Sequence, residues 1–454
     1  MRQHQVTARQ IAVEVLNRVE QDQAYANIEL AKLLRRAQLD SRDRALATEL
    51  TYGALRRRSL LDLAIGTACG RPLRQVAPTV LNTLRITAYQ LFYLSHIPAH
   101  AAVNEAVNLV RRMGEGRAQG FVNAVARRMA REGKPDIPPD TFSDLSEQLA
   151  TEWSHPAWLV KRWLSIYGET AVREFLPINQ LPAPLVLRVN TMQIDRSQFL
   201  ARLGRQGISA QLGPTPEAVI VDAGMKPADI PGYAAGWFVV QDVSSQLVAH
   251  ALNPQPGETV ADMCSAPGGK ATHIAQLMGD CGRVIAMELH AHRCRLVKAT
   301  AGRLRLKSIE VRQGDSQVVP PDWQHRFDRI LLDAPCTGTG VLRRRVDLRW
   351  RLQPQDQKEL VQVQKRLLAA AAQMLRPGGR LVYSTCSLEP EENQQQIAAF
   401  LIDQPEWRRG SLDHLQEVAA SLTAAHPEVH KAELQLLPSH ESDGFYLAVL
   451  ERNS

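Results

Sequence analysis

The chain has 454 residues, of which 44% are hydrophobic and 22% are charged, a composition typical of a soluble globular protein with a large core. It contains no apolar run approaching the ~20 residues needed to span a bilayer, and its first residues lack the apolar core of a signal peptide. We therefore expect a cytoplasmic protein with reduced thiols and no membrane partner. The six cysteines form no CxxC pair, which argues against a metal site or a disulfide framework.

The first third of the chain is basic and helical in pattern. Residues 1–134 hold 21 Lys and Arg against 11 Asp and Glu, whereas the rest of the chain holds 33 against 36. Apolar residues from Ile11 to Val19 recur at helical spacing, and Ser41 is the expected N-cap of a later helix. Each basic run alone is also explained as a solvated helix face, but the whole asymmetry favours nucleic-acid binding. We predict an all-α RNA-binding domain over residues 1–140.

The next part of the chain mixes helical and strand-like patterns. The stretch REGKPDIPPDTFSD is typical of a linker. After it come a helical segment, HPAWLVKRWLSIYG, and three strand-like segments, APLVLRVN, AVIVD and GWFVVQD. Residues 141–240 are therefore predicted to form a small α+β linker subdomain.

From residue 241 to residue 454, short apolar strands alternate with helices. The strand-like segments ETVADMC, RVIAMEL, IEVRQGD, FDRILLDAP and GRLVYSTC end in polar or small residues, and DGFYLAVLER is expected as a last, antiparallel strand. This alternation predicts a parallel sheet covered by helices on both faces. The predicted fold class is α/β, with a Rossmann-like domain following the two smaller ones.

Such sheets bind ligands beyond the carboxyl ends of their strands. The first strand runs into CSAPGGK, residues 264–270, where two glycines allow close approach of the backbone to a ligand; a plain strand-to-helix turn has the same pattern. The turn matches neither the GxxxxGK[ST] phosphate loop nor the GxGxxG dinucleotide fingerprint. Acidic residues end three further strands, at Glu288, Asp315 and Asp333. Carboxylates suit ribose hydroxyls and an adenine amino group, so a nucleoside cofactor without a pyrophosphate, such as S-adenosylmethionine, fits best.

Two cysteines, Cys336 in DAPC and Cys386 in STCS, follow neighbouring predicted strands. A lone cysteine is most often a small core residue, but Pro, Gly, Thr and Ser neighbours are unusual for core packing. Methylation of cytosine at C5 needs a thiolate that adds to C6, and a second acid or base helps to resolve the adduct. Methylation at nitrogen needs no cysteine and usually has an Asp/Asn-Pro-Pro-aromatic loop where this chain has DAPC. Two cysteines at adjacent strand ends meet both needs of C5 chemistry.

These motifs resemble the RNA cytosine-5 methyltransferases of the Nop/Sun type, in particular the bacterial Sun/Fmu-type enzymes that act on 16S ribosomal RNA. The matching segments are VQDVSSQLVAHAL, CSAPGGK, QGD, LLDAPCTGTGVLRR, PGGRLVYSTCSLEPEEN and DGFYLAVL. The first third of the chain also resembles the Nus-B antitermination factor, and LVLRVNT matches the segment that precedes the catalytic domain. The resemblance covers nearly the whole chain.

The resemblance implies roles for individual residues. Position alone favours Cys336 as nucleophile, because DNA cytosine-5 methyltransferases attack from the corresponding loop. In the resembled RNA family the TCS cysteine attacks, so Cys386 is the expected nucleophile and Cys336 is expected to help release the product. Glu288 stands where Asp is usual, and Ser265 stands where Ala is common. The residues expected to bind S-adenosylmethionine are Cys264, Ser265, Ala266, Pro267, Gly268, Gly269, Lys270, Glu288, Asp315 and Asp333.

The implied function is S-adenosylmethionine-dependent methylation of C5 of one cytosine in 16S ribosomal RNA through a covalent Cys–C6 intermediate. We expect a monomer with RNA as its partner and no metal. Two alternatives remain: the same chemistry on another structured RNA such as transfer RNA, or on DNA, and a Nus-B-like RNA-binding protein with an inactive methyltransferase domain. The arginines of VLRRRVDLRW, just after Cys336, are expected to hold RNA phosphates. The target cytosine is expected to be flipped out of its surroundings.

Overall fold

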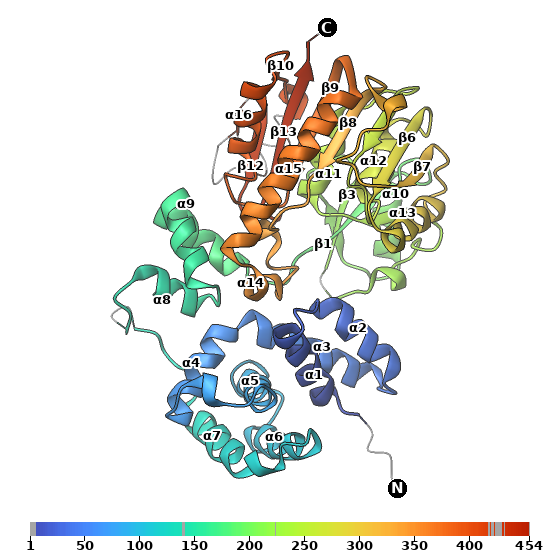
Figure 1. Ribbon diagram of the computed structural model, residues 1–454. Helices are drawn as coiled ribbons and strands as arrows, with labels where there is room; N and C mark the ends of the chain where they lie inside the picture. Colours follow the sequence, from blue (N-terminus) through green and yellow to red (C-terminus); the bar gives the residue numbers. More distant parts are fainter. Residues whose placement is uncertain are drawn as a thin grey trace. The chain divides into compact units, whose positions relative to one another are not determined.

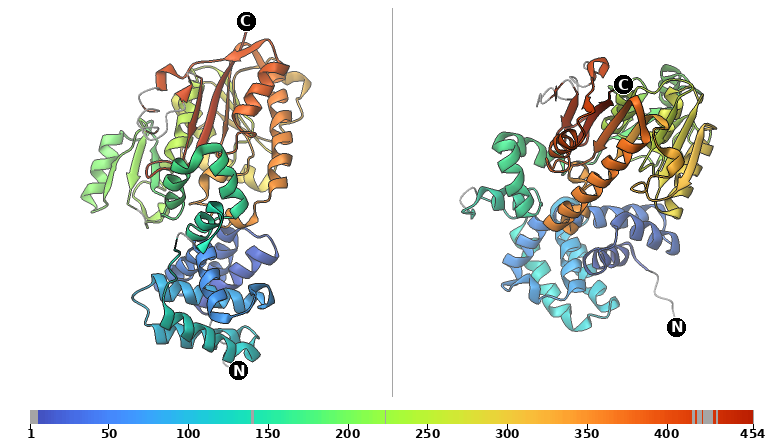
Figure 2. Two further views of the ribbon diagram at one scale, coloured as in Figure 1. Left: turned by 90° about the vertical axis from the view of Figure 1, so that its left-hand side faces the viewer. Right: turned by 45° about the horizontal axis from the view of Figure 1, so that its top comes forward.

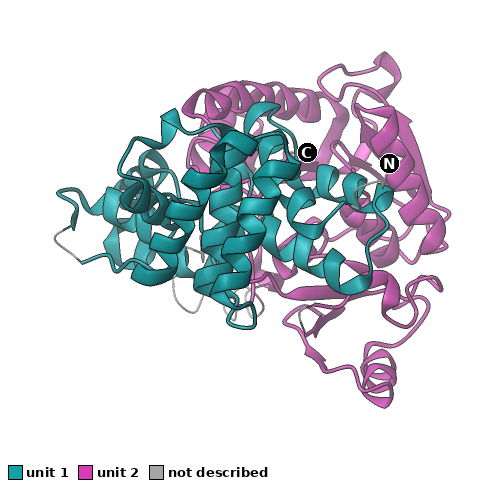
Figure 3. Ribbon diagram, turned by 90° about the horizontal axis from the view of Figure 1, so that it is seen from below, with its two compact units in different colours: residues 1–181, 342–352 teal, residues 182–341, 353–454 magenta. Residues whose placement is uncertain are grey.

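The computed structural model describes residues 6–138, 141–222, 224–415, 418, 422, 429–430 and 432–453. The chain forms two compact units, shown in two colours in Figure 3. Unit 1 contains residues 1–181 and 342–352, and unit 2 contains residues 182–341 and 353–454. The predicted linker includes Pro139 and Asp140, which lie outside the described residues. The division into three domains stays a prediction, because a compact unit can contain more than one domain.

Unit 1 is helical, as predicted for the first third of the chain. Its helix α3 begins at Ser41, but the N-cap is Asp40, whose carboxylate accepts a hydrogen bond from the backbone N–H of Asp43. The predicted cap was wrong by one residue because Asp and Ser cap helices equally well. The helices of unit 1 are α1 (Ala8–Gln21), α2 (Ala26–Arg36), α3 (Ser41–Arg56), α4 (Arg58–Cys69), α5 (Pro78–Tyr93), α6 (Ala99–Arg112), α7 (Gln119–Glu132), α8 (Leu145–Glu152), α9 (Ala157–Ile178) and α14 (Leu348–Arg351).

The short segment 342–352 packs within unit 1, although it is distant in sequence from the rest of that unit. Arg349 is fully buried, and its guanidinium donates to the backbone carbonyls of Ser154 and Asn179, both at 3.0 Å. The indole N–H of Trp350 donates to the carbonyl of Leu55 at 2.7 Å. The expectation that the arginines of this segment hold RNA phosphates is therefore wrong for Arg349, whose donors serve the fold.

Unit 2 contains a small antiparallel sheet and a large sheet. The small sheet has the strand order β2-β3-β1-β4 and carries one helix, α10. Its strands β1, β3 and β4 were predicted, whereas the three-residue strand β2 was not. The elements of this part are β1 (Leu185–Val189), α10 (Arg196–Arg205), β2 (Ala210–Leu212), β3 (Ala218–Val221) and β4 (Phe238–Val240).

The large sheet follows the predicted alternation of strands and helices (Figure 1). Its order in the described residues is β11-β12-β13-β9-β8-β5-β6-β7, with β10 paired to β13. The pairs from β9 to β7 are parallel, and β13 is antiparallel, as predicted. The strands are β5 (Thr259–Asp262), β6 (Arg283–Glu288), β7 (Ile309–Gln313), β8 (Phe327–Asp333), β9 (Leu375–Thr385), β10 (Trp407–Arg409), β11 (Val429–His430), β12 (Glu433–Leu436) and β13 (Phe445–Arg452).

Helices cover both faces of the large sheet (Figure 2). Alternate strand residues point to opposite faces, so Val260 packs with the helices α11 (Val243–Leu252), α12 (Gly269–Leu277) and α13 (Ala291–Arg303). Its neighbour Ala261 packs with α15 (Pro354–Met374) and α16 (Gln394–Asp403). The strand order reverses between β5 and β8, and the carboxyl ends beside such a point are where ligands bind. Among the described residues, no helix is long and apolar enough to cross a membrane.

Candidate active site

The two predicted cysteines lie together at the carboxyl ends of β8 and β9. These strands are parallel neighbours, with Asp333 opposite Ser384. The Sγ atoms of Cys336 and Cys386 are 3.4 Å apart, and both residues are half-buried and free of disulfides. The hydrogen bond with Cys386 and burial raise the pKa of the Cys336 thiol well above its ordinary value. The thiol of Cys336 therefore holds its proton at neutral pH.

Glycines bring the two cysteine loops into direct backbone contact. The N–H of Gly340 donates to the carbonyl of Cys386 at 2.9 Å, and the N–H of Gly444 donates to the carbonyl of Gly340 at the same distance. A Cβ atom on Gly340 would lie 2.2 Å from the carbonyl oxygen of Gly444. The GTG and DGF motifs thus require glycine at these positions because two loops cross there.

A buried carboxylate, Glu392, joins the same two loops. It is 0% exposed and accepts hydrogen bonds from the backbone N–H of Thr337 at 2.9 Å and from the side-chain amide of Gln364 at 3.0 Å. The hydroxyls of Thr337 and Ser387 also donate to it. Because these two residues follow the two cysteines directly, Glu392 fixes one cysteine loop against the other. Sequence reasoning missed this residue.

An ion pair lies beside the cysteines. Nζ of Lys270 is 2.7 Å from Oδ2 of Asp333, whose other oxygen accepts a hydrogen bond from the hydroxyl of Ser384 at 2.9 Å. Burial is the largest effect on the pKa of Lys270 and lowers it, but the carboxylates of Asp333 and Asp262 and the charge of an ionised Cys386 together raise this pKa above its ordinary value. The ammonium group in turn favours the ionised form of Cys386.

The residues from Cys264 to Lys270 form the turn from β5 into α12, which we call the glycine turn. The N–H and the hydroxyl of Ser265 both donate to the carbonyl of Met287, at 2.9 and 3.0 Å. Gly268 has a φ of 102° and lies against α13, where an added Cβ would be 3.1 Å from the Cα of Val297. Burial raises the pKa of the Cys264 thiol, which makes it an unreactive cysteine.

The predicted acidic residues lie at the neighbouring strand ends. Glu288 ends β6, is 4% exposed, and accepts a hydrogen bond from the N–H of His290 at 2.9 Å. Asp315 follows β7, is exposed, and accepts from the N–H of Gln317 at 2.9 Å. The N–H of Gly314 donates to the carbonyl of Glu288 at 3.1 Å, which keeps the two strand ends adjacent. The structure therefore brings the glycine turn and all three predicted acids to one edge of the sheet.

Asp262 is a fourth acidic strand end, and sequence reasoning passed over it although it precedes Cys264 by two residues. It ends β5 and is fully buried. Burial, with a smaller contribution from the charge of Asp333, raises the pKa of Asp262 to about 7.

Asp262→Asn is expected to gain stability relative to the wild type as pH rises from about 4 to about 7. The folded wild type holds its proton over this window while the unfolded chain, with an ordinary pKa of 3.8, releases it. The free energy of unfolding of the wild type therefore falls over this window, by on the order of 4 kcal/mol in total, whereas that of the Asn variant has no such contribution. Urea unfolding of both proteins at several pH values measures this, and a pH-independent difference would contradict it.

Fold and site together define a class: a Rossmann-like methyltransferase domain joined to a helical module. Three family models match the chain in the same order. They are the NusB family over residues 6–131, the ferredoxin-like domain of RsmF/B-like methyltransferases over residues 155–227, and the 16S rRNA methyltransferase RsmB/F family over residues 249–451. The chain belongs to the family of ribosomal RNA small subunit methyltransferase B.

Relatives match along the whole length of the chain. A protein of Bacillus subtilis described as a probable ribosomal RNA small subunit methyltransferase B is 37% identical over 98% of this chain and 99% of its own. A Klebsiella pneumoniae protein described as ribosomal RNA small subunit methyltransferase B is 35% identical over 98% of each chain. Among solved structures, PH0851 is 25% identical with a TM-score of 0.81 over 98% of each chain. A methyltransferase homolog from Pyrococcus horikoshii is 29% identical with a TM-score of 0.57, over 68% of this chain and 100% of its own.

Proposed function

We propose that this protein transfers the methyl group of S-adenosylmethionine to C5 of one cytosine in 16S ribosomal RNA. The observation that carries the choice of C5 is the pair of sulfur atoms, 3.4 Å apart, at the ends of β8 and β9. Methylation at a nitrogen or at a ribose hydroxyl has no use for two adjacent thiols. The names of the bacterial relatives support ribosomal RNA as the substrate.

The residues at the sheet edge suit S-adenosylmethionine. Glu288 offers a buried carboxylate to ribose hydroxyls, and Asp315 offers an exposed one to an adenine amino group. Leu289 directly follows Glu288, and Val318 is three residues after Asp315; both are exposed, at 53% and 67%, and offer apolar surface to a ring. Gly268 and Gly269 open the backbone at the start of α12. When bound there, the cofactor would supply an electrophilic methyl group.

The proposed reaction is nucleophilic catalysis by Cys386. Its thiolate, favoured by Lys270, adds to C6 of the cytosine and makes C5 nucleophilic. After C5 has gained the methyl group, a base removes the C5 proton, the bond between sulfur and C6 breaks, and the thiolate is restored. Asp333, which pairs with Lys270, is proposed to accept a hydrogen bond from the target cytosine. Cys336 is proposed to assist the final elimination, since its sulfur contacts that of Cys386.

The test is the identity of the methylated nucleoside. Incubation of the protein with 16S RNA and S-adenosylmethionine, followed by digestion and mass spectrometry, is expected to give 5-methylcytidine. Formation of N4-methylcytidine or of a ribose-methylated nucleoside would refute the proposal. Transfer RNA and DNA, tested under the same conditions, separate the proposed substrate from the alternatives.

We also propose that the basic helical unit binds RNA phosphates. Arg111, Arg112 and Arg117 are exposed around the connection between α6 and α7. Changing all three to Ala is expected to weaken RNA binding and to reduce the slope of log affinity against log salt by about one for each phosphate that is no longer neutralised. Binding titrations at several salt concentrations measure both effects. Point substitutions are preferable to deletion of residues 1–134, because deletion would remove the partner of Trp350.

The matched control removes the same number of positive charges elsewhere. Arg326, Arg376 and Arg408 lie on unit 2 and pair with acidic residues. Their triple Ala variant is expected to keep the wild-type salt slope. Equal weakening of RNA binding in both triple variants would mean that net charge, and not a local surface, determines affinity.

A further inference from the structure

Arg188 is a fully buried arginine of the small sheet. Its N–H groups donate hydrogen bonds to the start of α12, next to the glycine turn of the large sheet. It lies in β1 and is 1% exposed. One terminal nitrogen donates to the carbonyl of Gly269 and to Oε1 of Gln241, both at 2.6 Å. The other donates to the hydroxyl of Thr272 at 3.0 Å. Its Nε is buried without a hydrogen-bond partner. A buried guanidinium whose terminal nitrogens bond only to a backbone carbonyl and neutral side chains is unusual, because burying an arginine is costly.

These acceptors belong to the segment that opens α12. Gly269 is the first residue of this helix, and the hydroxyl of Thr272 donates back to the carbonyl of Gly268 at 2.7 Å. Arg188 therefore holds the glycine turn from the side facing the small sheet. Lys270, whose ammonium pairs with Asp333, follows Gly269 directly. Displacement of this turn would move both the proposed cofactor site and the cation beside the cysteines.

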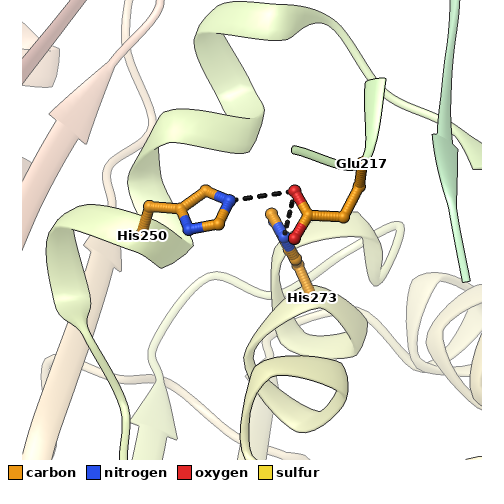
Figure 4. A group of neighbouring side chains, drawn as sticks. All are labelled: Glu217, His250 and His273. Atoms are coloured by element: carbon orange, nitrogen blue, oxygen red, sulfur yellow. Dashed lines mark hydrogen bonds and ion pairs between the residues drawn. The ribbon is translucent and has the colours of Figure 1, made fainter. Parts of the chain in front are cut away.

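One buried carboxylate, Glu217, offsets part of the cost of burying the charge of Arg188. Glu217 immediately precedes β3, the strand paired with β1, and its charge acts on Arg188. Figure 4 shows the rings of His250 and His273 around the Glu217 carboxylate. Oε2 of Glu217 is 2.9 Å from Nε2 of His250 and 3.7 Å from Nε2 of His273. Burial and the charge of Arg188 lower the pKa of His273 to about 3, so this ring is neutral and adds no positive charge.

The same three side chains form the one group of described residues that could hold a metal ion, with ligand atoms within 4.8 Å of one another. Both ring nitrogens of His273 are buried without a hydrogen-bond partner. A divalent cation here would add two positive charges close to Arg188, whose charge already acts on Glu217 and His273. The charge balance thus favours the metal-free cluster, in which Glu217 is the counter-charge of Arg188.

We propose that Arg188 is a positioning residue for S-adenosylmethionine: from the small sheet it fixes the glycine turn in its binding conformation, with Glu217 as its counter-charge. This rests on the proposed cofactor site. The small sheet thereby gains a role in the reaction through Arg188.

The test uses the full-length protein and S-adenosylmethionine as the probe. Arg188→Met is expected to weaken cofactor binding in calorimetric titration, and to raise the KM for the cofactor, by at least about tenfold. The KM for RNA is expected to stay near the wild-type value. Arg188→Lys, which keeps the charge and can reach one acceptor, is expected to recover part of the loss. Thr272→Val, which keeps the volume and removes one acceptor, provides a milder variant if Arg188→Met does not fold.

Arg303→Met is the matched control. Arg303 joins α13 to the small sheet through the carbonyls of Tyr233 and Phe238, at 2.9 and 2.8 Å, and does not bond to the glycine turn. The Arg303→Met variant is expected to lose stability while keeping its cofactor affinity.

Wild-type affinity in both Arg188→Met and Thr272→Val would overturn the inference, whereas absence of binding by the wild type would instead overturn the proposed function. A Zn²⁺-dependent gain in cofactor affinity that His250→Ala abolishes would overturn the metal-free cluster.

Discussion

Cys336→Ala is expected to accumulate a covalent protein–RNA adduct that survives denaturation when S-adenosylmethionine is present. Cys386 keeps its sulfur and the neighbouring Lys270, so addition to C6 proceeds. The final elimination is slowed, because the variant lacks the thiol that lies 3.4 Å from the attacking sulfur in the wild type. Denaturing electrophoresis with labelled 16S RNA measures the trapped fraction over time.

Cys386→Ala is expected to give neither adduct nor methylated product, because no thiolate remains to make C5 nucleophilic. Cys281→Ala is the control, since Cys281 is an exposed cysteine in a turn away from the strand ends that carry the pair. It is expected to turn over at the wild-type rate. An adduct in Cys386→Ala and none in Cys336→Ala would exchange the two roles and would match the arrangement of DNA cytosine-5 methyltransferases.

The sequence predicts the large sheet well, together with the edge at which its ligands are expected to bind. Parallel strands are buried on both faces, so their sequences are nearly continuous apolar runs. Each such run ends where a polar or small residue begins, so Glu288, Asp333 and the cysteines could be placed at strand ends without any knowledge of the fold. The same signal included Asp262, which was overlooked because the cysteine and glycines that follow it are more conspicuous.

Other features depend on interactions between distant segments and leave no local pattern. The strands AQL at 210–212 and ELQL at 433–436 are too short for periodicity to reveal them. Arg349 belongs to a basic run that resembles a phosphate-binding loop, yet two of its acceptors are carbonyls 195 and 170 residues away in sequence. Arg188 meets Gly269 across 81 residues. Charge in the sequence indicates a cation, whereas only the fold shows whether its partner is solvent, RNA or backbone.

Glu392→Gln is expected to lower kcat by about 100-fold, because small displacements of reacting groups carry losses of this size. The carboxylate accepts hydrogen bonds from the N–H and hydroxyl of Thr337 and from the hydroxyl of Ser387. An amide of the same shape would turn its N–H₂ group toward the two hydroxyls, which would have to change from donors to acceptors, and the stronger hydrogen bonds to a charged carboxylate would be lost. The two cysteine loops would then no longer be fixed against each other. Cofactor affinity should remain unchanged, since Glu392 does not bond to the glycine turn.

The step affected can be isolated by placing Glu392→Gln in the Cys336→Ala background, where the rate of adduct formation reports addition of Cys386 to C6 alone. This rate is expected to fall as kcat falls in the single variant. Glu391→Gln is the matched control, because the adjacent Glu391 is less buried and accepts from the side chain of Gln357 at 2.9 Å, apart from the hydrogen bonds that join the cysteine loops. If adduct formation in the Glu392→Gln background kept its rate, the carboxylate would be a structural residue of the core, and the spacing of the two sulfur atoms would have to be fixed by the Gly340–Gly444 crossing instead.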